Sequence, residues 1–152
     1  MKTVILKRYN NVQFEAIANE AITPGSLVEV MSTGKIKNHA TAQGNAIPYF
    51  VIEDAIMGKT INDKVAKDDL ARVMVAGRGD EVYAILATSQ TILVGDLLAS
   101  AGGLGALEKF TAIKCDSNAS AGAVTTPLQA VAVALEAVTT TSATKRIKVR
   151  II

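Results

Sequence analysis

The sequence predicts a mainly β protein: an antiparallel barrel or sandwich-like single domain with long loops and at most one or two short helices. Three observations predict this class. Short segments alternate apolar and polar residues with a period of two, as half-buried strands do. Glycine, proline and asparagine turns separate them. The 152 residues are 49% hydrophobic but only 4% aromatic, so the core is built from small and β-branched side chains, which suit closely packed sheets.

Strands and turns alternate along the first third of the chain. Residues 13–18 alternate in polarity and predict a strand. Thr23-Pro24-Gly25 is a Pro–Gly turn, residues 26–31 are strand formers, and Ser32-Thr33-Gly34 turns the chain again. Residues 48–52 form a short apolar run, which predicts a buried strand.

Residues 64–70 are open to two interpretations. A helix would begin with Asn62 or Asp63 as its N-cap and would place apolar residues on one face. A turn would bend the chain at Lys67-Asp68-Asp69 between two strands. We prefer the turn, because the segment 72–76 that follows is rich in β formers.

The middle of the chain predicts a β-hairpin. Residues 72–76 and 81–87 are both strand-like, and the short loop Gly77-Arg78-Gly79-Asp80 joins them. Arg78-Gly79-Asp80 also matches the integrin-recognition tripeptide. The match is short, and a place in a hairpin loop explains it structurally.

Further short elements follow. Residues 91–94 predict a strand, Gly95-Asp96 a turn, residues 101–105 a glycine-rich loop, residues 110–115 a strand and residues 116–122 a loop of small residues. The glycine loop lacks the Lys-Ser/Thr pair of a phosphate loop.

The last part of the chain predicts two more strands. Residues 130–138 contain helix formers, but their polarity alternates with a period of two, so we predict a strand. Residues 139–144 form a Thr/Ser-rich connector. In residues 146–152, apolar side chains alternate with Arg146, Lys148 and Arg150, which predicts a closing strand with these three on its solvent face.

Charge and composition exclude several classes. A net charge of +2 is too small to indicate a nucleic-acid partner, and no window approaches the ~20 apolar residues of a membrane helix. We therefore expect a protein made in a cytoplasm with neither partner. The single Cys115 cannot form an internal disulfide, and we predict that it is a small, buried, hydrophobic side chain. The sequence Asn118-Ala119-Ser120 fits a glycosylation acceptor, but nothing indicates secretion.

No constellation for catalysis, cofactor binding or metal binding stands out. His39 is the only histidine and lies in the polar segment 38–45, so we expect it at the surface. Cys115 is 76 positions away (115 − 39), too far in sequence for a zinc motif. Glu53-Asp54 and Asp68-Asp69 lack the spacing of a calcium loop. We predict no enzyme, no cofactor and no metal site.

Several segments, taken in order, resemble the head decoration (cement) proteins of tailed bacteriophages. These segments are AITPGSLVEV (21–30), GDEVYAIL (79–86), QTILVGDLLASAGG (90–103), AVALEAV (132–138) and RIKVRII (146–152). The resemblance covers most of the chain from about Phe14 onward. It implies a β-barrel-like protein, usually trimeric, at three-fold and quasi-three-fold positions of the expanded shell.

This resemblance implies a structural function. The protein would decorate the outer capsid surface of the virion and clamp neighbouring major capsid subunits, with the major capsid protein and its own copies as partners. The alternative is another virion surface component, such as a tail part or a spike or adhesion module that binds glycans. The charge, close to balance, fits a protein that stays soluble before assembly.

We divide the chain into a segment 1–12 and a β-rich decoration domain 13–152. The first segment is either an arm that orders on the capsid or an ordinary first strand of the domain. If it is an arm, it can add a strand to a sheet edge of the partner. The candidate capsid contacts are Met1, Lys2, Val4, Leu6, Lys7, Arg8 and Tyr9.

Overall fold

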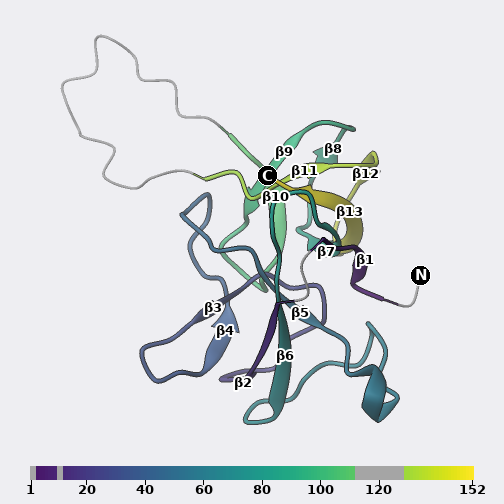
Figure 1. Cartoon of the computed structure of the whole chain (residues 1–152). Coiled ribbons are helices and arrows are strands. Elements are labelled where there is room, and N and C mark those ends of the chain that lie inside the picture. The colour runs from purple at the N-terminus through teal and green to yellow at the C-terminus, as the bar shows by residue number, and fades with distance from the viewer. Residues whose placement is uncertain (1–2, 10–11, 112–128) are drawn as a thin grey trace, which may run out of the picture.

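A closed five-stranded barrel forms the upper part of the molecule in the view of Figure 1. The computed structural model describes residues 3–9, 12–111 and 129–152. The barrel strands, in spatial order, are β7 (Glu81–Leu86), β10 (Leu107–Lys109), β9 (Leu97–Ser100), β11 (Ala132–Ala134) and β13 (Lys145–Ile151). A long antiparallel pairing of β13 with β7 closes the ring, whereas β10 lies parallel to β7. A closed ring leaves none of its strands as an open edge.

Smaller sheets and one short helix complete the fold. A three-stranded antiparallel sheet has the order β2-β6-β5 and lies below the barrel in Figure 1. Strands account for 44% of the described residues, which confirms the mainly β class, and the only helix among these residues is a single 3₁₀ turn. The bounds of these elements are β1 (Ile5–Lys7), β2 (Gln13–Ile17), β3 (Val28–Val30), β4 (Ile36–Asn38), β5 (Tyr49–Ile52), η1 (Ala55–Met57), β6 (Leu70–Val75), β8 (Thr91–Ile92) and β12 (Val138–Thr139).

Two apolar clusters meet at the three-stranded sheet. Phe50 and Met74 point from one face of this sheet into the barrel cluster, which also holds Ile147 and Val149. Val51 and Val73, on the opposite face, pack into the cluster beneath the β3–β4 hairpin. Because side chains of a strand alternate between faces, one short sheet serves both clusters and joins them into one domain.

The predicted hairpin of residues 72–76 and 81–87 is wrong. β6 pairs with β2 and β5, whereas β7 pairs with β1, β10 and β13. Residues 77–80 therefore connect two different sheets. Alternating polarity and a short glycine loop describe each strand locally, but they do not determine its partner, which packing of the whole chain selects.

The turn predictions hold in the first half of the chain. Ser26 donates its N–H to Thr23 O, and Gly25 has a φ of 91°, so the Pro–Gly pair forms the predicted turn. Residues 67–69 form a bend before β6, which confirms the turn interpretation of 64–70 over the helix. Gly95-Asp96 and the loop 101–105 also turn the chain as predicted.

Two predictions in the second half need correction. The strand predicted at 130–138 is broken by a bend at Leu135 and Glu136 and splits into β11 and β12. Phe110 and Thr111 lie outside any strand, and the rest of the strand predicted at 110–115 falls outside the described residues. Cys115 and the segment 118–120 also lie outside them. No helix in the described ranges has the length and apolar character that crossing a membrane requires.

Arg146 departs from the predicted solvent face of the closing strand. Its guanidinium is half-buried, donates to Pro24 O at 2.8 Å and to Ile61 O, and lies 5.9 Å from the centroid of the Tyr83 ring. Burial lowers the pKa of Arg146 from its ordinary value. Arg146 therefore ties the closing strand to two loops, whereas Arg150 is exposed as predicted.

Candidate functional site

The N-terminal segment is paired with the barrel. β1 runs antiparallel to β7, with Ile5 opposite Val82. Val4 is fully buried in the barrel cluster, its N–H donates to Glu53 Oε2 at 3.0 Å, and its carbonyl accepts from Tyr83 N–H at 2.7 Å. Val4 is thus a core residue with no surface to offer a partner. Leu6 is half-buried, and Met1 and Lys2 lie outside the described residues.

The exposed candidates follow directly after Leu6. Lys7, Arg8 and Tyr9 are all exposed, Tyr9 by 66%. The Lys7 Nζ lies 5.2 Å from the Tyr9 ring centroid. Interaction with the Tyr9 side chain, chiefly by hydrogen bonding, raises the pKa of Lys7. Lys7 is thus a cation beside an exposed aromatic ring.

Neighbouring strands and one loop add further arginines to this region. Lys7 stands opposite Glu81 on β7, and Glu81 stands opposite Arg150 on β13, whose Nη2 lies 2.7 Å from the Glu81 carboxylate. The Tyr9 ring lies against Gly79, next to the exposed Arg78: a Cβ built on Gly79 would be 3.3 Å from the ring. We call the set Lys7, Arg8, Tyr9, Arg78 and Arg150 the basic surface.

The basic surface has the composition of a protein-binding surface. It carries four cations against two carboxylates, those of Glu81 and the buried Asp80, and its aromatic residue is a tyrosine. Arginine and tyrosine are enriched where proteins bind one another. Cations that remain at the rim of such a contact chiefly speed the approach of an acidic partner and fix its orientation.

Asp80 holds this region in place and is not available to a partner. It is fully buried. Its carboxylate accepts the N–H of Tyr9 at 2.7 Å and the N–H of Gly77 at 2.8 Å. The Arg-Gly-Asp match is therefore a structural turn whose aspartate faces inward. Sequence reasoning placed Asp80 in a hairpin loop and missed its role as an anchor for the N-terminal segment.

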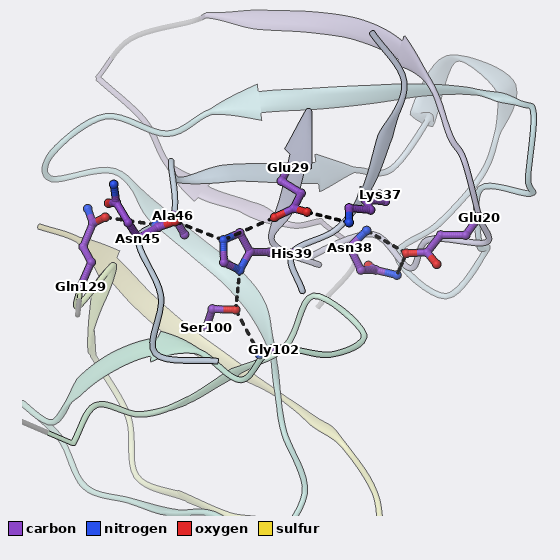
Figure 2. A network of polar contacts seen from close by, with 10 residues as sticks. All are labelled: Glu20, Glu29, Lys37, Asn38, His39, Asn45, Ala46, Ser100, Gly102 and Gln129. Carbon is purple, nitrogen blue, oxygen red and sulfur yellow. Dashed lines mark hydrogen bonds and ion pairs between the residues drawn. The ribbon is translucent and has the colours of Figure 1, made fainter. Parts of the chain in front are cut away.

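The prediction of a surface histidine is wrong. His39 is only 4% exposed and lies within a polar network (Figure 2). Its Nδ1 is 2.8 Å from Ser100 Oγ, and its Nε2 is 3.2 Å from Asn45 O and 3.6 Å from a Glu29 carboxylate oxygen. Ser100 Oγ in turn accepts the N–H of Gly102 at 3.2 Å. Nothing in the polar segment 38–45 indicated that β9 would cover this ring.

The hydrogen bonds define what this network does. A carbonyl oxygen only accepts, so Nε2 of His39 donates to Asn45 O, and Nδ1 shares a hydrogen bond with the Ser100 hydroxyl. The ring thereby joins the end of β4 to β9 and to the loop before β5. Ser100 is fully buried, so its hydroxyl is enclosed and not presented to solvent. A hollow of about 510 Å³ opens beside the network, with Val30, Ile47, Tyr49, Glu29 and His39 among its lining residues.

The acidic pairs serve local structure. Glu53 accepts the N–H of Val4, and Asp54 accepts that of Met57 at the start of the 3₁₀ turn. Asp68 pairs with Lys35 at 2.8 Å, mainly by a hydrogen bond, and this lowers the pKa of Asp68. Across the described ranges, no group of three or more His, Cys, Asp or Glu side chains is placed to hold a metal ion.

The fold and the surface define a small β-barrel protein with an appended three-stranded sheet and a basic, tyrosine-bearing surface. No protein-family model and no curated protein matches the chain. Among solved structures, the chain is similar to the N base of the head fiber gp8.5 of bacteriophage phi29. The TM-score is 0.51, with 19% identity over 93% of each chain. At this identity the likeness shows a shared fold.

Proposed function

We propose that this chain is a structural protein associated with the head of a tailed bacteriophage. The observation that carries the proposal is the fold shared with the phi29 head fiber base over 93% of both chains. The ordered sequence segments that resemble head decoration proteins point to the same part of a virion. One line of support is backbone geometry and the other is the pattern of side chains along the chain.

The proposed attachment site is the basic surface. Lys7, Arg8 and Tyr9 were candidates from the sequence alone, and the structure adds Arg78 and Arg150 beside them. A complementary acidic patch on the major capsid protein is the partner that this chemistry fits. Binding through cations at the surface would weaken as salt rises, since exposed charges are screened.

The finer proposal is a cement role on the outer surface of the virion. Three linked copies would bind a shell far more tightly than one, through effective concentration. Support for self-association comes from exposed apolar side chains in the turn between β8 and β9 and at the start of β9: Leu93 is 60% exposed, Val94 68% and Leu97 42%. Large apolar patches are uncommon on proteins that remain monomeric. A trimer that clamps neighbouring subunits is the expected assembly.

We also propose that the protein works without catalysis. The support is the enclosure of Ser100 and the use of both His39 nitrogens in structural hydrogen bonds. A nucleophile and its base need access to a reacting group. If a hydrolytic activity were measured and lost in His39→Ala with the fold intact, this part of the proposal would fall.

Head binding tests the main proposal. Purified protein is mixed with expanded heads of its own phage that lack it, and bound protein is measured by co-sedimentation and located by electron microscopy. We expect binding to the outer shell, weakened at least tenfold by Lys7→Glu with Arg8→Glu. Lys59→Glu with Lys67→Glu is the matched control, because it changes the net charge equally at exposed lysines elsewhere. Point substitutions are preferable to deletion of residues 1–8, which would remove the buried Val4.

Two further measurements separate the finer roles. A cement protein raises the resistance of heads to heat or chelators and sediments as a trimer in analytical ultracentrifugation. The alternative role is a base for a fiber or spike. The fold similarity to the head fiber base of phi29 supports this alternative. That alternative predicts binding without a gain in head stability, and an adhesive role would show in glycan-array binding. Absence from heads altogether contradicts both.

A further inference from the structure

β2 presents an open edge. It pairs with β6 in a regular five-residue register, with Phe14 opposite Val73 and Ala16 opposite Ala71. In the described part of the chain, no other named strand pairs with it. Figure 1 shows β2 at the border of its sheet, beside β6. Beyond Ile17, the bridge of Ala18 with Ile36 closes the edge, so the open stretch is β2 itself.

The hydrogen bonds show which backbone groups face outward. Ala18 donates its N–H to Asp69 O at 2.9 Å, and Val12 O accepts from Val75 N–H at 3.0 Å. In an antiparallel pair, alternate residues bond to the partner, so the even-numbered residues of this stretch face β6. The backbone groups of Gln13, Glu15 and Ile17 therefore point away from β6.

Natural edge strands discourage strand addition by charged side chains, lysine above all, by proline, by a bulge or by a cover of other elements. In β2 the one charged side chain is Glu15, which favours a basic partner strand over an acidic one. β2 contains no lysine or proline, and its register with β6 is uninterrupted. A hollow of about 410 Å³, lined by Gln13, Phe14, Glu15 and Arg72, lies along it.

The side chains on the edge define the pattern of a fitting strand. Phe14 and Ala16 are only partly buried against the apolar cluster beneath the β3–β4 hairpin. An added strand with apolar residues beside them would extend that cluster. Glu15 lies on the other face. Its carboxylate is 3.3 Å from Arg72, which also reaches Asp54 at 3.6 Å, so this group carries a net negative charge. A basic residue opposite Glu15 is the favourable cross-strand partner.

We propose that β2 accepts an extended segment of another protein by strand addition, with a basic residue opposite Glu15 and apolar residues on both sides of it. Backbone hydrogen bonds to Gln13, Glu15 and Ile17 give the affinity, and the alternating side chains give the specificity. A second copy of this chain fits less well. In the fully overlapping antiparallel register, two Glu15 carboxylates lie opposite each other, and shifted registers leave part of each strand unpaired. The site is separate from the basic surface and does not depend on the proposed function.

Amide hydrogen exchange of the whole chain tests the proposal. The probes are three synthetic peptides of about eight residues, in which valine alternates with lysine, glutamate or threonine. We expect the lysine peptide to slow exchange of the Gln13, Glu15 and Ile17 amides at least tenfold at millimolar peptide. The glutamate peptide should have little effect. Equal protection by all three peptides, or none by the lysine peptide, overturns the proposal.

Variants at Glu15 make the test specific. Proline at position 15 removes an N–H that points outward and leaves the bonds to β6 in place. Glu15→Pro should therefore abolish protection while the far-UV circular dichroism is unchanged. Glu15→Lys should reverse the preference, so that the glutamate peptide protects these amides better than the lysine peptide. This reversal tests the proposal even if the proline variant unfolds. Asp69→Lys, the same charge change at an exposed turn residue, is the control and should keep the original preference. Self-association that Glu15→Gln strengthens and the lysine peptide does not displace would instead identify a second copy as the occupant.

Discussion

The glycine loop between β9 and β10 gives a quantitative test of the packing. Gly105 has a φ of 60°, and a Cβ built on it would lie 2.4 Å from Leu27 O and 2.7 Å from Ser26 Cβ. Leu27 also donates its N–H to Gly105 O at 2.7 Å. An added methyl group therefore meets backbone that cannot move without breaking this hydrogen bond. The loop is a packed junction between the barrel and the segment that leads into β3.

Three alanine substitutions separate the two costs at this position. Gly103→Ala places its Cβ in open space without a positive φ, so we expect a change within about 0.5 kcal/mol. Gly34→Ala also meets open space but at a φ of 80°, which costs about 1–2 kcal/mol. Gly105→Ala combines the positive φ with overpacking, which adds about 1–3 kcal/mol. Its total loss of about 2–5 kcal/mol is a large share of the stability of a typical domain.

Urea unfolding followed by far-UV circular dichroism measures these differences. With a slope of about 2 kcal/mol per molar urea, a loss of about 3 kcal/mol lowers the midpoint by about 1.5 M. The slope itself should be the same for all three variants, because the folded state stays equally compact. If Gly105→Ala costs no more than Gly34→Ala, the close approach of Gly105 to Leu27 is not a feature of the folded protein.

Substitutions at three further positions probe the polar anchors. Asp80→Ala leaves two backbone donors without their acceptor and should cost about 3 kcal/mol in urea unfolding, with Asp80→Asn less severe. His39→Leu should cost about 1–3 kcal/mol by the same assay, because Asn45 O and Ser100 lose their partner. The Leu93 N–H and then Lys109 hold the pKa of Asp96 below its ordinary value. Its stabilising effect is present above about pH 4 and is lost as the pH falls through the folded pKa. Asp96→Asn should therefore show a smaller loss of urea midpoint between pH 6 and pH 3.

Local patterns in the sequence predicted the strands better than their partners. The closing strand is the clearest success: Ile147, Val149 and Ile151 are buried as the period of two predicted. The hairpin between β6 and β7 is the clearest failure, although each of its strands exists. Alternation records which face of a strand is buried, and that is a property of one segment. Pairing depends on contacts between distant residues, such as Lys145 with Leu86, and a single sequence carries no direct signal for these.

The candidate site was predictable only where it is exposed. Lys7, Arg8 and Tyr9 form a polar, charged run, and the structure leaves all three exposed. Val4, in the same run of candidates, is buried because β1 pairs with β7 and turns this side chain into the barrel. His39 shows the opposite error. Its neighbours in sequence are polar, but the residues that cover it come from β9, which is distant in sequence.

The open edge of β2 differs from the edges of the barrel strands and of β5. Closure of the barrel gives each of its five strands neighbours on both sides, and β1 extends the cover of β7. β5, at the far side of the small sheet, is covered by Leu27 and by the hydrogen bond from Val51 N–H to Ser26 O. An open strand edge lowers solubility unless something binds it. The basic surface belongs to the barrel and the open edge to the small sheet. A protein held to a shell through the first can therefore still bind an extended segment through the second. If the two sites are separate, the variant with Lys7→Glu and Arg8→Glu should lose head binding. Protection of the β2 amides by the lysine peptide should be unchanged in that variant.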